Sequence, residues 1–322
     1  MKKLPFRAVL VLVILCLLTQ NVMAAQLLIP GGQVIGLELQ DGSVTVAAFD
    51  ETLGASAKAA GLKAGDRILQ IDDTQISCAE DIRKALNCSD GRVDICVQRG
   101  NKRKQLTLSP AATDQGPRLG VYLKQGTTGI GTVTYYDPET KDFAALGHGV
   151  NTSGGELLQM QKGSVFDAQV RTVKKGAVGT PGQLCGGLLS NTPKGTIDKN
   201  TVQGVFGNLD AGITGTPLPV AKNTDIHTGS ATIRSTVEAD ALQEYSVEIL
   251  KIYPNRSDRS RNMLLKVTDP SLLETTGGIV QGMSGSPIIQ DGKLVGAVTH
   301  VLVNDPTMGY GIFIENMLAA AA

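Results

Sequence analysis

The sequence contains no tryptophan and few other aromatic residues, with six tyrosines and six phenylalanines among its 322 residues. Aliphatic side chains must therefore supply most of any hydrophobic core. Glycine, by contrast, is abundant at 38 residues, well above the average share of about 7%. Short runs of Val, Ile, Leu and Thr between glycine-containing turns are typical of a mainly β protein.

The chain also lacks any excess of charge, because 30 Lys and Arg residues balance 30 Asp and Glu residues. This balance argues against nucleic acid as the main partner. The phosphate-binding motif Gly-x-x-x-x-Gly-Lys-Ser/Thr and the zinc-binding motif His-Glu-x-x-His are absent, and the five cysteines show no Cys-x-x-Cys spacing. We expect no cofactor and no metal. A Cys88–Cys96 disulfide and buried free thiols are both open possibilities.

Residues 1–25 have the pattern of an export signal. Lys2, Lys3 and Arg7 form a basic start, residues 8–18 are an unbroken apolar run, and small or apolar residues at 22–24 suit a signal peptidase. The run is shorter than the roughly 20 residues that a membrane-spanning helix needs. We expect either a signal peptide cleaved near Ala24 or an uncleaved membrane anchor, with the rest of the chain extracytoplasmic.

Residues 26–110 carry a second pattern. The segment Ala-Ala-Gly-Leu-Lys-Ala-Gly-Asp-Arg-Ile-Leu at 59–69 precedes an Asp-Asp turn, a helix predicted at 79–86 and an alternating strand at 93–99. This order resembles a PDZ domain of the type found with bacterial peptidases. The resemblance implies binding of an extended peptide or a C-terminus, with Val34, Ile35, Gly36 and Leu37 as the carboxylate-binding loop. A packing module without a ligand is the alternative.

A polar, turn-rich linker is expected at 111–116, followed by a second domain at 117–322. Its short β runs, for example at 131–136, 168–173 and 245–252, are separated by Gly, Asn, Pro and Asp. Such spacing predicts a sandwich or a pair of barrels.

The sharpest motif of this domain is Gly-Met-Ser-Gly-Ser-Pro at 282–287. Glycines before and after Ser284 allow a tight turn that exposes the hydroxyl and directs N–H groups at one point, as an oxyanion hole requires. The following segment predicts a hairpin with an Asp-Gly turn at 291–292. Ser284 is the candidate nucleophile.

A serine nucleophile needs a base, and the chain has three histidines. His148 stands between two glycines after an apolar stretch, where its ring can project freely. The sequence around His227 predicts a surface hairpin turn, and His300 lies on the strand predicted after the serine hairpin. We therefore predict His148 as the base. For the acid that orients it, we choose Asp269 at the end of an apolar strand over Asp142 and Asp210.

Three segments together resemble the stage IV sporulation protein B peptidases: Ala-Leu-Gly-His-Gly at 145–149, Thr-Gly-Gly-Ile-Val-Gln-Gly-Met-Ser-Gly-Ser-Pro at 276–287, and Gly-Ala-Val-Thr-His-Val-Leu-Val-Asn-Asp-Pro-Thr at 296–307. The resemblance implies an N-terminal PDZ domain followed by a chymotrypsin-like double β-barrel. Its triad would be His148, Asp269 and Ser284, with the N–H groups of Gly282 and Ser284 as the oxyanion hole and Thr299 and His300 as cleft walls.

The same resemblance implies a function in spore formation. Such a peptidase crosses the forespore membrane, cleaves itself, and cleaves a membrane-complex regulator so that an intramembrane protease can process a sigma-factor precursor. Two alternatives remain: an envelope quality-control peptidase, which usually carries its PDZ domain after the peptidase, and a catalytically inactive PDZ-containing binding protein.

Overall fold

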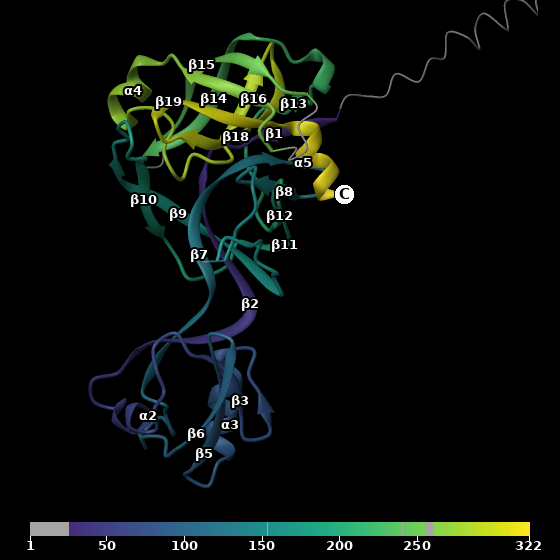
Figure 1. Cartoon of the computed structure of the whole chain (residues 1–322). Coiled ribbons are helices and arrows are strands. Elements are labelled where there is room, and N and C mark those ends of the chain that lie inside the picture. The colour runs from purple at the N-terminus through teal and green to yellow at the C-terminus, as the bar shows by residue number, and fades with distance from the viewer. Residues whose placement is uncertain (1–25, 153, 240, 255–259) are drawn as a thin grey trace, which may run out of the picture.

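The computed structural model describes residues 26–152, 154–239, 241–254 and 260–322. The predicted signal or anchor at 1–25 lies outside these residues. Strands dominate, and they form two barrels and one separate lobe (Figure 1). No helix within the described ranges has the length and apolar character needed to cross a membrane.

Barrel 1 is a ring of six strands. Its antiparallel pairings run from β2 (Val34–Phe49) through β9 (Lys162–Lys174), β11 (Gly195–Thr201), β12 (Gly204–Leu209) and β8 (Asp142–Ala145) to β7 (Val121–Tyr136), which pairs with β2 again. β1 (Leu27–Pro30) pairs with both β7 and β13 (Leu218–Pro219), and β10 (Gln183–Leu188) pairs with β9. Aliphatic side chains such as Leu37, Val133 and Val165 fill the ring.

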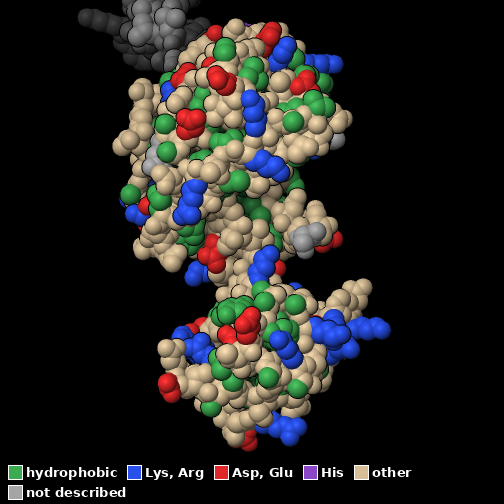
Figure 2. Space-filling view, turned by 90° about the vertical axis from the view of Figure 1, so that its left-hand side faces the viewer, with side chains coloured by type: hydrophobic (Ala, Val, Ile, Leu, Met, Phe, Trp, Pro, Cys, Tyr) green, Lys and Arg blue, Asp and Glu red, His purple; other side chains and the backbone are tan. Residues whose placement is uncertain are grey.

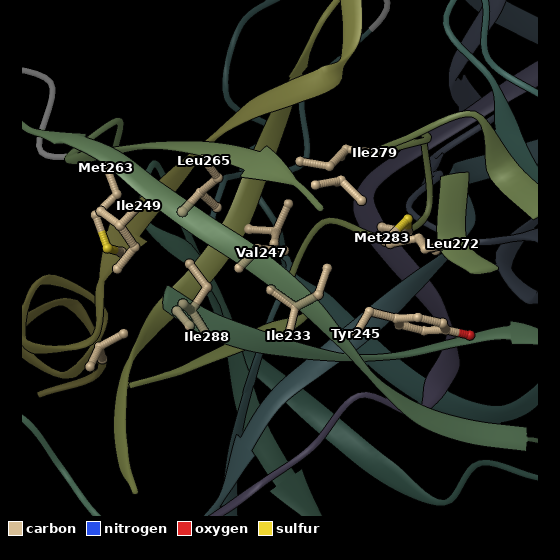
Figure 3. Close-up of a cluster of buried hydrophobic side chains, with 14 of the residues drawn as sticks. Ile233, Tyr245, Val247, Ile249, Met263, Leu265, Leu272, Ile279, Met283 and Ile288 are labelled. Carbon is tan, nitrogen blue, oxygen red and sulfur yellow. The ribbon is translucent and has the colours of Figure 1, made fainter. Parts of the chain in front are cut away.

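Barrel 2 closes from β14 (Gly229–Glu238) through β15 (Ala241–Ile252), β16 (Met263–Val267), β19 (Asp305–Phe313) and β18 (Lys293–Leu302) to β17 (Pro287–Gln290). A short 3-10 turn, η1 (Asn223–Asp225), precedes it, and two helices accompany it, α4 (Pro270–Thr276) and α5 (Ile314–Ala321). Its core is almost wholly aliphatic, with Ile233, Val247, Ile249, Leu265 and Ile288 in contact (Figure 3). This agrees with the scarcity of aromatic residues.

The third unit, the PDZ lobe (residues 44–125), is built on the other halves of β2 and β7. Between them lie α2 (Ala55–Ala59), β3 (Arg67–Ile71), β4 (Thr74–Gln75), α3 (Ala79–Cys88), β5 (Val93–Arg99) and β6 (Lys102–Leu108). It has its own hydrophobic core. Figures 1 and 2 show it joined to the barrels by a narrow waist, which β2 and β7 cross as a two-stranded ribbon.

The mainly β fold and the pair of barrels agree with the sequence analysis, but the expected boundaries at 26–110 and 117–322 differ from the structure. Residues 27–39 pair within the sheet of barrel 1, so the peptidase part begins before the PDZ lobe and resumes after it. The reason is that β2 and β7 each run through both units without a break. Cys78, Cys88, Cys96 and Cys185 are free thiols.

Candidate active site

The serine loop (residues 281–286) lies where barrel 2 meets barrel 1. Gly282 and Gly285 have φ angles of 101° and 100°, in the region that side-chain-bearing residues rarely adopt. A Cβ atom on Gly285 would lie 2.1 Å from the carbonyl oxygen of Thr132. The N–H of Gly285 donates to the carbonyl of Val298 at 2.7 Å. The glycines that flank Ser284 are therefore required by backbone conformation and by space.

Two threonines of β7 fasten this loop to barrel 1. The hydroxyl of Thr132 donates to the Gly282 carbonyl at 2.7 Å, and the hydroxyl of Thr134 donates to the Gly285 carbonyl at 2.8 Å. Both threonine side chains are buried. The sequence analysis missed them. The one available signal was polar threonine at alternate positions of an otherwise apolar strand.

Ser284 projects into the interface between the barrels. Its neighbour Met283 is fully buried in the core of barrel 2 (Figure 3), which anchors the loop beside the serine. The Ser284 hydroxyl donates to the carbonyl oxygen of Thr299 at 2.8 Å. In this arrangement its proton is directed at β18.

His148 follows β8 after two residues in left-handed conformation, Leu146 at φ 71° and Gly147 at φ 66°. Gly147 lies against barrel 2, since a Cβ there would be 2.9 Å from Thr299 and 3.1 Å from Ile312. The turn thus brings the half-buried imidazole to the barrel interface. Burial lowers the pKa of His148, and a hydrogen bond to the Gly149 carbonyl opposes this only in part.

One cavity of about 540 Å³ joins the candidate residues. It is lined by Ser284 and Gly282, by His148 and His300, and by residues 127–130 of β7. The rings of His148 and His300 are 5.4 Å apart between centroids and tilted by 44°. Within the described parts of the chain, no Asp or Glu lines this cavity.

Asp269 takes a different position from the one predicted. It is the N-cap of α4, where one carboxylate oxygen accepts from the N–H groups of Ser271 and Leu272 at 3.0 and 3.1 Å, and the other accepts from the N–H of Ser246 at 3.2 Å. Burial raises its pKa, but the hydrogen bond from the Ser271 hydroxyl and these backbone hydrogen bonds outweigh burial and lower the pKa below its usual range. The structure thus gives the carboxylate a capping role and shows no contact with His148.

The two other candidate acids are Asp142, on β8, and Asp210, directly after β12. Asp142 is the first residue of β8, whereas His148 follows the last residue of that strand. Asp210 comes directly after β12, whose Asn208 pairs with Asp142. Both are exposed. They lie at the end of the β8–β12 pair remote from His148.

Thr299 and His300, the two predicted cleft walls, both line the cavity. The Thr299 side chain is buried, and its hydroxyl donates to the carbonyls of Tyr310 and Ser260 at 3.2 and 3.3 Å. Thr299 therefore meets the cavity through its carbonyl, which holds Ser284. His300 lines the cavity directly. His227 is an exposed surface residue with its Nε2 2.8 Å from Asp291.

The predicted oxyanion hole stays a prediction. Among the hydrogen bonds of the described residues, the N–H groups of Gly282 and Ser284 have no acceptor, whereas the N–H of Gly285 is already bonded. Two unbonded donors beside the Ser284 hydroxyl are what an oxyanion hole requires.

The predicted carboxylate-binding loop is misplaced. Gly36 pairs with Ile130 of β7 on one side and with Phe166 of β9 on the other, and Val34, Ile35 and Leu37 lie in the same ring. A strand with both edges paired cannot accept a peptide. In the PDZ lobe, a cavity of about 820 Å³ instead lies between α3 and the start of β7, where residues 118–123 line it.

The loop at that groove has the features expected of the carboxylate site. Gly120 is left-handed at φ 68°, and its carbonyl accepts from the N–H of Asp50. Among the described hydrogen bonds, the N–H groups of Leu119 and Gly120 have no acceptor. Consecutive free N–H groups around a left-handed residue form an anion-binding concavity. The sequence Leu-Gly-Val at 119–121 resembles Ile-Gly-Leu at 35–37, so the pattern alone did not separate them.

Comparison with known proteins identifies two regions whose bounds lie closer to the sequence prediction than to the units of the structure. The family model described as SpoIVB peptidase S55 matches residues 115–318, and a PDZ domain model matches residues 34–109. A putative zinc metalloprotease of Agrobacterium fabrum is 30% identical over 79 residues, which are 24% of this chain and 21% of the relative. The chain thus spans about a fifth of the length of that relative. Within the described ranges, no cluster of His, Cys, Asp and Glu could hold a metal ion.

Three solved structures are similar in part. The PDZ domain of the SdrC-like protein of Listeria monocytogenes is 25% identical, covering 25% of this chain and 85% of that one, with a TM-score of 0.22. The Rv3671c protease in its inactive form, and a mutant of it from M. tuberculosis, are 13% and 12% identical. Each match covers 59% of this chain. The matches cover 81% and 78% of the two Rv3671c chains, with TM-scores of 0.36 and 0.34.

The S55 model spans well over half of the chain and includes barrel 2, every strand of the barrel 1 ring except β2, and both His148 and Ser284. This protein belongs to the SpoIVB peptidase S55 family and carries a PDZ domain.

Proposed function

We propose that the protein is a serine endopeptidase in which Ser284 is the nucleophile and His148 the general base. The observation that carries the proposal is the single cavity that Ser284, His148 and the Gly282 backbone share between the barrels. The Nδ1 atom of His148 is 3.0 Å from the Gly149 carbonyl. A carbonyl can only accept, so Nδ1 carries the proton and Nε2 keeps the lone pair that a base needs.

The reaction then follows from these positions. The Ser284 hydroxyl turns from Thr299 toward His148, which takes its proton as the oxygen attacks the scissile carbonyl. The N–H groups of Gly282 and Ser284 stabilise the oxyanion, and His148 gives the proton to the leaving amine. In this mechanism the Gly149 carbonyl sets the tautomer of His148, and Asp269 stabilises α4 rather than the imidazole.

Family membership and the N-terminal sequence pattern support a proposed cellular role. The peptidase acts outside the cytoplasm, exported or anchored through residues 1–25, in the signalling of spore formation. It cleaves itself near its N-terminus and then a membrane-complex regulator, which frees an intramembrane protease to process a sigma-factor precursor. The PDZ lobe selects the protein substrate.

A second function has one specific observation in its favour. The hydroxyl of Ser284 is bonded to Thr299, an arrangement that suits a catalytically inactive binding protein as well as a peptidase at rest. One experiment distinguishes an active peptidase from an inactive binding protein.

The test is incubation of the purified full chain and of a Ser284→Ala variant, with mass spectrometry of the fragments released. We expect N-terminal fragments from the wild type and none from the variant, with both proteins equally folded by circular dichroism. Fragments from the variant at the wild-type rate would overturn the assignment of Ser284. If neither protein releases fragments, and the variant releases none when wild type is added, the result favours an inactive binding protein.

A further inference from the structure

Residues of one strand, β7, line both cavities. Residues 121–123 of β7 line the groove of the PDZ lobe, and residues 127–130 of the same strand line the cavity of Ser284. β2 occupies one edge of β7 from Val121 to Thr132. Along this stretch, no described strand pairs with the other edge. Both sites are therefore open to one extended peptide.

The backbone groups at the Ser284 end point toward that open edge. Thr132 faces Val34 in the β2–β7 register, yet its own N–H donates to the Ser284 carbonyl and its C=O accepts from Leu146. Its polar groups thus point away from β2. Because alternate residues of an antiparallel strand share this direction, Ile130 and Thr128 present their N–H and C=O groups to the cavity.

The direction of the peptide is fixed by the groove. A peptide added to β7 with its carboxylate on the N–H groups of Leu119 and Gly120 runs antiparallel to β7. Its residues farther from the C-terminus then lie beside higher-numbered residues of β7. At Thr132 the peptide reaches the serine loop, which is bonded to that residue. One antiparallel peptide therefore has the correct direction for both sites.

We propose that β7 acts as a measuring strand: a substrate whose free C-terminal carboxylate lies in the PDZ groove is cleaved at a fixed distance from that terminus. This rests on the proposed role of Ser284. β7 has eleven residue steps from Val121 to Thr132, or roughly 36 Å at about 3.3 Å per residue. An extended peptide pairs residue for residue, so the C-terminal product has about 10–14 residues, the range allowing for the irregular pairing at Gly126.

The test uses a library of random 24-residue peptides with free C-termini, digested by the full chain and measured by mass spectrometry. We expect the C-terminal fragments to cluster at about 10–14 residues. Amidation of the C-termini removes the carboxylate and should lower the rate at these positions at least tenfold. Cleavage with a broad distribution of lengths, unchanged by amidation, would overturn the measuring strand and leave the peptidase assignment intact.

A matched pair of variants tests the groove. Arg83 and Lys84 are exposed neighbours on α3, and only Arg83 lines the groove. Arg83→Glu places a negative charge there and should abolish the clustering, whereas Lys84→Glu should retain it. Equal effects of the two variants would count against the groove. Absence of any wild-type cleavage would instead contradict the proposed function.

Discussion

The hydroxyl of Thr132 donates to the carbonyl of Gly282 at 2.7 Å, across 150 residues of sequence. This bond and the one from Thr134 to Gly285 join a strand of barrel 1 to the serine loop of barrel 2. The carbonyl of Gly282 is thereby fixed, and so is the peptide unit that leads to Ser284. Barrel 1 thus shapes a loop that belongs to barrel 2.

Replacing Thr132 by valine removes the donor while keeping the shape of the side chain. The half-buried carbonyl of Gly282 then loses its partner, and an unpaired buried acceptor costs up to about 1–3 kcal/mol. We expect kcat/KM on a peptide substrate to fall at least tenfold as the loop loosens. Thr172→Val, at an exposed position of β9, is the control for the replacement of threonine by valine. Equal activity of the two variants would show that the bond does not shape the site.

The capping role of Asp269 predicts a mild effect of Asp269→Asn. Asparagine is as good an N-cap as aspartate, so kcat/KM should stay within a few-fold of the wild type. Asp269→Ala should lower the free energy of unfolding by about 1 kcal/mol. A loss near 10⁴-fold in Asp269→Asn with the fold intact, as known triads show, would restore Asp269 as the catalytic acid.

The pH profile of kcat/KM should report the burial of His148. Burial disfavours the imidazolium, which lowers the pKa below its ordinary value of 6.5. The base form therefore persists as the pH falls, and activity is lost only when the pH drops through the lowered pKa. With an uncharged peptide substrate, we expect the acid midpoint below 6.5. A midpoint at or above 6.5 would contradict this environment for His148.

In the PDZ lobe, the carboxylate of Asp66 is fully buried. Its two oxygens accept hydrogen bonds from the Nε and Nη2 atoms of Arg99, each at 2.6 Å. Burial raises its pKa, and the bonds from Arg99 and from the N–H of Lys63 outweigh burial and lower it. Its contribution to stability is therefore present above its ordinary pKa and lost as the pH falls through the lowered one.

Arg99→Met leaves this carboxylate without its partner. We expect the PDZ lobe to lose about 3–5 kcal/mol of unfolding free energy at pH 7, measured by urea denaturation. Arg103→Met, at an exposed site on the neighbouring β6, should change it by less than about 0.5 kcal/mol. Similar losses in both variants would mean that the ion pair does not stabilise the lobe.

The serine loop was predictable because its requirements are local. Two glycines at left-handed φ, an Asp-Gly hairpin and a histidine between glycines all appear in short stretches of sequence. The capping position of Asp269 also had a local signal, since aspartate before proline is a common start of a helix. The choice of Asp269 as the acid rested on its place at the end of an apolar strand and did not consider a helix cap there.

Long-range pairing was not predictable in the same way. The alternation of residues 34–39 indicates a strand but not its partners, so the same residues fit a PDZ lobe and a barrel equally well. The partnership of Thr132 with Gly282 likewise depends on the meeting of two barrels. Only the structure separates the apolar-Gly-apolar segment at 35–37 from the one at 119–121.

The continuity of β2 and β7 also decides how the chain can be cut. Because barrel 1 holds the polypeptide on both sides of the PDZ lobe, a single nick in a loop of the lobe releases neither piece. The two fragments stay interlocked through strands of the same ring, and they travel as one particle in solution while migrating separately after denaturation. Excising the lobe therefore takes two cuts and a new turn that joins the halves of β2 and β7 at the waist.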